Sequence, residues 1–74
     1  YPNPASTHVI LKIENNELTN FTYKLYDAKG ALLRTEKITA YETTINLAPL
    51  KPAIYFIGIQ SGKEEIKVFR IIKH

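Results

Sequence analysis

The most constraining feature of this chain is an alternation of apolar and polar residues in short runs that are separated by turn residues. Alternation with a period of two is typical of half-buried β-strands, whereas an amphipathic helix needs apolar residues three and four apart. No window combines that helical spacing with capping signals at both ends. The alternation predicts six strands, at His8–Glu14, Phe21–Asp27, Ala31–Thr39, Glu42–Leu47, Ala53–Gln60 and Glu64–Lys73.

Three local patterns refine this prediction. The segment Asp27-Ala28-Lys29-Gly30 predicts a tight hairpin turn, because Gly30 can adopt the positive φ of such a turn and Asp27 can accept bonds from backbone N–H groups ahead of it. The fifth run, Ala53–Gln60, is apolar on both faces, which predicts a central, well-buried strand. In the sixth run the period slips between Val68 and Phe69, which predicts a β-bulge or a switch between sheets.

Six short strands in 74 residues predict an all-β fold, a small antiparallel sandwich or barrel. This length allows one modest core, so residues 1–74 are expected to form a single domain. The chain has no cysteine, which excludes disulfides, thiolate zinc sites and iron–sulfur clusters. It also has no methionine, and we expect it to be an excised piece of a longer protein.

The sequence offers no recognisable site for chemistry. His8 and His74 are the candidate general bases, and neither stands near a nucleophile motif. Glu64 and Glu65 are adjacent on a strand and point to opposite faces, so they cannot act as a pair. We therefore expect a protein that is not an enzyme, with no catalytic residues, no cofactor and no metal.

The charges also point away from nucleic acid. The net charge of +3 comes from residues of both signs that are scattered along the chain. A local excess occurs at the end, at Lys67, Arg70, Lys73 and His74. Aromatic residues that alternate with basic ones are expected to form the core of so short a chain rather than to stack on bases. No apolar run approaches the roughly 20 residues of a membrane-spanning helix, so no membrane insertion is expected.

Four short motifs stand in order along the chain: YPNPA at residues 1–5, YKLYDAKGALL at 23–33, TINLAPLKPAIYFI at 44–57 and KVFRIIK at 67–73. In this order they resemble the type A C-terminal sorting domain of the type IX (Por) secretion system, along essentially the whole chain. The matching motif positions are Pro2, Asn3, Pro4, Asp27, Gly30 and Tyr55. Ala53 stands where the family usually has glycine, and alanine can still adopt the β conformation.

The resemblance implies an immunoglobulin-like antiparallel β-sandwich of six to seven strands. It also implies a secreted parent protein of a Gram-negative bacterium, which passes through the periplasm on the way to the cell surface or the extracellular space. The implied partners are an N-terminal cargo domain, the outer-membrane translocon and a cell-surface sortase, which often removes the domain.

The last strand is the candidate surface for translocon recognition, because cations and surplus apolar residues coincide there. Its residues are Lys67, Phe69, Arg70, Ile71, Ile72 and Lys73. Of the adjacent pair Ile71 and Ile72, at most one can face the core. An edge strand of this kind could bind a partner by strand addition, and a weak dimer could form through the same strand.

A second interpretation is a non-catalytic fibronectin-like or carbohydrate-binding module of a secreted enzyme. It requires an exposed aromatic platform, for which Tyr41, in an expected loop, is the best candidate.

Overall fold

The computed structural model describes residues 7–13, 21–62 and 64–74. These residues form six strands: β1 His8–Lys12, β2 Phe21–Asp27, β3 Leu32–Lys37, β4 Glu42–Asn46, β5 Ala53–Ser61 and β6 Glu64–Lys73. The described residues hold no helix that is long and apolar enough to span a membrane. The strand predictions are confirmed in number and order, and the bounds of β2 and β6 coincide with the predicted ones.

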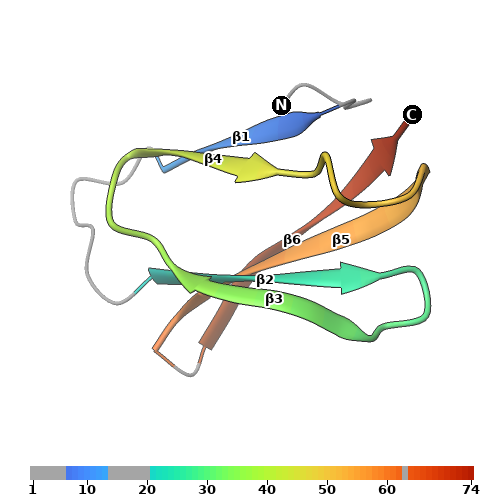
Figure 1. The fold of residues 1–74 in the computed structure, drawn as a ribbon. Coiled ribbons are helices and arrows are strands. Elements are labelled where there is room, and N and C mark those ends of the chain that lie inside the picture. The colour runs from blue at the N-terminus through green and yellow to red at the C-terminus, as the bar shows by residue number, and fades with distance from the viewer. Residues whose placement is uncertain (1–6, 14–20, 63) are drawn as a thin grey trace.

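The strands form two antiparallel sheets, one with the order β1-β4 and the other with the order β3-β2-β5-β6. The two sheets face each other, with β1 and β4 lying over the four-stranded sheet (Figure 1). This order corresponds to strands B and E of an immunoglobulin-like sandwich on one side and to C′, C, F and G on the other. The predicted all-β, immunoglobulin-like sandwich is therefore confirmed.

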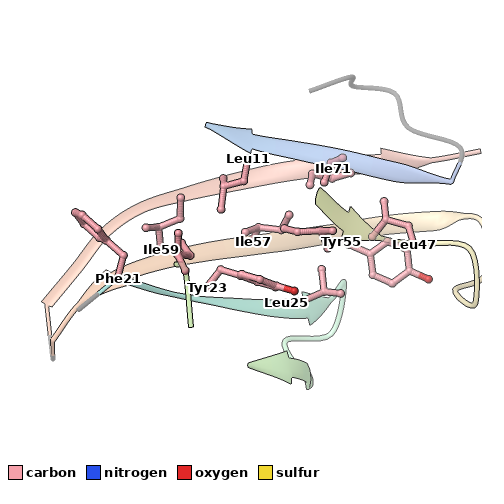
Figure 2. Close-up of a cluster of buried hydrophobic side chains, with 12 residues drawn as sticks. Leu11, Phe21, Tyr23, Leu25, Leu47, Tyr55, Ile57, Ile59 and Ile71 are labelled. Atoms are coloured by element: carbon pink, nitrogen blue, oxygen red, sulfur yellow. The ribbon is translucent and has the colours of Figure 1, made fainter. Parts of the chain in front are cut away.

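The core lies between the sheets and draws on every strand except β3 (Figure 2). Its buried residues are Val9, Leu11, Phe21, Tyr23, Leu25, Ile38, Ile45, Leu47, Tyr55, Ile57, Ile59 and Ile71. The inward-facing residues of β2 and β5 lie directly opposite each other in the sheet, as in the pair Leu25 and Ile57. Alternation along these two central strands therefore supplies half of the buried core residues.

The structure corrects the prediction for the fifth strand. β5 is central, since β2 and β6 pair with its two edges. The side chains of its inward face are well buried, whereas the opposite face of the four-stranded sheet has no second layer among the described residues. On that outer face Ile54 is 40% exposed and Phe56 is half-buried.

The predicted irregularity in β6 is present at a different place. Ile59 pairs with Lys67 and Gln60 pairs with Glu65, so Ile66 is the extra residue of a β-bulge. No bulge or change of sheet occurs between Val68 and Phe69. The apolar pattern slips there because Val68 is an exposed apolar residue on the outer face, whereas Phe69 faces inward opposite Ile57.

The predicted hairpin turn joins β2 to β3. Gly30 has a φ of 88°, in the left-handed region that favours glycine. One carboxylate oxygen of Asp27 accepts bonds of 2.9 Å from the backbone N–H groups of Lys29 and Ala31. This short turn fixes the register of the hairpin.

Ile57 and Ile54 offer a matched test of the one-sided burial of β5. Ile57 is 1% exposed and Ile54 is 40% exposed. We expect Ile57→Val to lower the free energy of unfolding by about 1 kcal/mol, because the lost methylene leaves a small cavity. Ile54→Val should change it by less than about 0.5 kcal/mol. Urea denaturation followed by circular dichroism measures both, and equal losses would contradict this account of the sheet.

Tyr23 makes the stability sensitive to alkaline pH. Its ring is 1% exposed, and its hydroxyl donates a hydrogen bond to the Glu36 carboxylate on β3. Burial, and secondly this bond to Glu36, raise the pKa of Tyr23 above the ordinary value of 10.0. The folded state then holds the proton more tightly than the unfolded state, so this contribution is complete below pH 10.0 and is lost as the pH rises further.

We therefore expect the melting temperature of the wild type to fall between about pH 9 and about pH 11, and Tyr23→Phe to make this fall shallower. At neutral pH the same variant should cost about 1 kcal/mol, through the lost hydrogen bond. Tyr41→Phe, at a residue that is 52% exposed, is the control and should retain the alkaline slope. Parallel slopes for Tyr23→Phe and the wild type would refute the assignment.

Candidate functional site

The candidate recognition residues all lie on β6, the last strand in the order of the four-stranded sheet. Among the described residues β5 pairs with one edge of β6, and no strand pairs with the other. Alternation divides the six residues between two faces of the sheet. Four of them lie opposite the odd-numbered residues of β5, which form its inward-facing row: Lys67, Phe69, Ile71 and Lys73. The other two, Arg70 and Ile72, lie on the outer face. The strand therefore does not present them as one surface.

Two of the six residues are anchors of the fold. Ile71 is 5% exposed and belongs to the core. Lys73 is 9% exposed, and its Nζ donates a hydrogen bond of 2.5 Å to the carbonyl oxygen of Leu50 in the loop between β4 and β5. A charged donor on a backbone carbonyl is among the stronger hydrogen bonds in proteins. These two side chains hold the end of β6 against the body of the sandwich.

The outer face of β6 is exposed and partly apolar. Arg70 is exposed, and Ile72 is 38% exposed beside it. Val68 and Ile66 are 50% and 52% exposed. The sequence analysis did not select these last two residues, although the slip in apolar period at Val68 was the signal that this residue faces outward; Ile66 is the bulge residue. The outer face thus offers aliphatic groups next to a guanidinium, a combination found at protein interfaces.

The remaining two residues lie at the other end of the strand. The Nζ atom of Lys67 lies 4.9 Å from the centroid of the Phe69 ring, which is a cation–π contact. Lys67 is exposed, and Phe69 is half-buried against the core. Two lysines six residues apart on one strand therefore have opposite roles: Lys73 is buried and bonded, whereas Lys67 reaches solvent.

The motif residue Tyr55 has a structural role. It stands near the start of β5 and is 5% exposed, and its hydroxyl donates a bond of 2.6 Å to the carbonyl oxygen of Lys51. A tyrosine near the start of strand F that bonds to the backbone a few residues upstream is the tyrosine corner of immunoglobulin-like domains. Ala53, two residues before it, pairs with Lys73 as part of β5, so alanine does fit the strand.

Of the other motif residues, Asp27 and Gly30 build the hairpin turn, and Pro2, Asn3 and Pro4 lie outside the described residues. Tyr41 lies in the loop between β3 and β4 and is 52% exposed. Within the described ranges no three His, Asp or Glu side chains gather in a way that could hold a metal ion.

These features define a small β-sandwich module with an exposed outer face on its last strand. Comparison with protein families shows which module it is. The family model for the secretion system C-terminal sorting domain matches residues 1–74, so the chain belongs to the C-terminal sorting domains of the type IX secretion system. Neither the curated proteins nor the solved structures contain a match.

Membership of this family confirms the coarse functional prediction. The domain is a C-terminal sorting signal of the type IX system, which interacts with the secretion machinery and serves an N-terminal cargo. It directs export to the cell surface or the extracellular space. The part that individual β6 residues play in recognition stays a prediction.

The two lysines of β6 provide a test of their division of roles. We expect Lys73→Met to lower the free energy of unfolding by about 1.5–3 kcal/mol, because the Leu50 carbonyl loses a charged donor. Lys67→Met should cost no more than about 1 kcal/mol, the usual limit of an exposed cation–π contact. Thermal or urea denaturation of both variants measures the difference. Equal stabilities would contradict an anchoring role for Lys73.

Proposed function

We propose that the type IX outer-membrane translocon recognises this domain through β6, by its outer face and by the edge that faces away from β5. The observation that carries the proposal is the division of this strand. Ile71 and Lys73 fix its end to the sandwich, while Arg70, Ile72 and Lys67 remain accessible. One set of side chains therefore holds the strand in place, and a different set can be recognised by a partner.

Strand addition is the mode of binding that fits this geometry. A partner strand that lies along the edge of β6 facing away from β5 gains main-chain hydrogen bonds, which supply affinity. The exposed aliphatic side chains and Arg70 then supply specificity. A dimer of two domains through the same edge would occupy these groups, so the proposed recognition state is the monomer.

In this proposal the domain acts as a ligand and not as an enzyme. It follows an N-terminal cargo through the periplasm and presents the folded cargo to the translocon. A cell-surface sortase then cleaves the domain from the cargo. The proposal assigns no catalytic residue, cofactor or metal to the domain, since its part is to be bound and removed.

An export assay tests this function. Residues 1–74 are fused behind a reporter that carries its own inner-membrane export signal, in a host with a type IX system. We expect the wild-type fusion to reach the cell surface or the medium. Lys67→Glu combined with Arg70→Glu should lower the exported fraction about tenfold, because charge reversal at an interface readily costs 1.4 kcal/mol or more.

The matched control is Lys29→Glu with Lys51→Glu, the same change of charge at two exposed residues outside β6. It should leave export within about twofold of the wild type. Circular dichroism and thermal melting of the isolated domains establish that both double variants fold. Retention of the wild-type fusion in the periplasm would refute the sorting function, and equal export of the two double variants would refute recognition through β6.

A further inference from the structure

β3 contributes its backbone to the four-stranded sheet but no residue to the core. It is the first strand in the order β3-β2-β5-β6, so it lies at the opposite end of the sheet from β6. Five of its six residues are exposed, and Arg34 is half-buried. β2 pairs with one edge of β3, and among the described residues no strand pairs with the other. At this second edge a strand of another molecule can extend the sheet.

The register of the β2–β3 hairpin determines which backbone groups of β3 point toward that edge. The N–H group of Ile38 donates a bond of 2.8 Å to the carbonyl oxygen of Phe21. In an antiparallel pair, residues that bond to the partner strand alternate with residues whose N–H and C=O groups point away from it. Glu36 and Arg34, two and four residues before Ile38, therefore bond toward β2. Thr35, between them, directs its N–H and C=O groups away from β2.

The charges of β3 complement those of a second copy of the same strand. When two copies pair in antiparallel fashion about a twofold axis at Thr35, Arg34 of each copy lies directly opposite Glu36 of the other. Such a pair, flanking the bonded residues, brings side chains closest, and opposite charges stabilise it. A shift of two residues in either direction places Glu36 opposite Glu36 or Arg34 opposite Arg34, which is unfavourable. A shift of one residue does not bring the outward-pointing groups of the two strands opposite each other. Charge therefore selects the register centred on Thr35.

Both charged side chains are held in place within each copy. Nη1 of Arg34 donates a bond of 2.9 Å to the carbonyl oxygen of Asn46, and a carboxylate oxygen of Glu36 accepts a bond from the hydroxyl of Tyr23. A guanidinium has several N–H donors and a carboxylate has a second oxygen, so each group can also bind across the interface. Because these side chains are already ordered, they lose less conformational freedom when the copies associate.

We propose that the domain binds a second copy of itself through β3, which joins the two four-stranded sheets edge to edge. One short strand from each copy forms the contact, so the interface is small and the dimer is weak and transient. β6 lies at the opposite end of each sheet and stays outside the contact. The dimer therefore presents two copies of β6, one at each end of the joined sheet. The proposal does not rest on recognition through β6.

NMR on a mixture of isotope-labelled and unlabelled chains tests this contact. The signals of residues 34–37 should shift with concentration between about 0.05 and about 2 mM, with a dissociation constant on the order of 1 mM or lower. A strong NOE should join the Hα of Arg34 to the Hα of Glu36 in the other copy. Within one strand these protons are about 6.6 Å apart, so a strong signal arises only between copies. Signals that do not change with concentration, or that shift only in another strand, would overturn the proposal.

Charge variants test the register. Arg34→Glu and Glu36→Arg each place like charges opposite one another in the homodimer, so each variant should self-associate about fourfold or more weakly than the wild type. A mixture of the two variants restores opposite charges at both positions and should associate within about threefold of the wild type. A mixture that associates no better than the separate variants would rule out this register.

Thr35→Pro tests the backbone bonds independently of charge. Proline removes an N–H group that points away from β2, so the hairpin keeps its bonds and the circular dichroism spectrum should match that of the wild type. Self-association should be undetectable by sedimentation at up to about 2 mM. Thr35→Val retains the N–H group and is the matched control, with association within about twofold of the wild type. Equal association of these two variants would contradict pairing through β3. All of these measurements use the isolated domain, so their outcome is independent of the sorting function.

Discussion

The rest of the structure depends on the inward-facing row of β5. Tyr55, Ile57 and Ile59 are each at most 5% exposed, and they lie opposite residues of both β2 and β6. A one-residue shift of β5 would turn this row to the outer face and expose the core. Register in the four-stranded sheet is therefore fixed by burial, and the Tyr55 hydroxyl adds a bond that fixes where the strand begins. A domain of 74 residues has little other apolar surface with which to stabilise itself.

This arrangement lets one strand stabilise the fold and, under the proposed recognition, also serve as the signal. Side chains on opposite faces of a strand have independent environments, so β6 can bury Ile71 and Lys73 while it exposes Arg70 and Val68. The bulge at Ile66 separates the two ends of the strand further, because a bulge changes the local twist and direction of a strand. Residues beyond it return to the core, and residues near it line the gap between the sheets.

Most of the fold could be predicted from the sequence because the patterns that define its strands and its hairpin turn involve residues close together in the chain. Alternation located the strands, and Asp27 with Gly30 located a hairpin turn whose bonds are formed within five residues. The site was harder, because the environment of a β6 residue depends on distant parts of the chain. Lys67 and Lys73 have similar neighbours in the sequence, and Lys73 is set apart by its bond to the Leu50 carbonyl, 23 residues away. The position of the bulge was likewise invisible, since it is defined by pairing with β5.

The contribution of β6 to the core also determines when, relative to translation, the domain can fold. β6 is the last of the six strands along the chain, and the core needs its Ile71. Ribosomes add roughly 5–20 residues per second, and sandwiches rich in long-range pairing fold in milliseconds to seconds. The sandwich therefore cannot close until translation has passed β6. An ordered β6 exists only after translation has passed this strand and the domain has folded. Under the proposed recognition, its presence therefore signals to the export machinery that the polypeptide ahead of it has been synthesised.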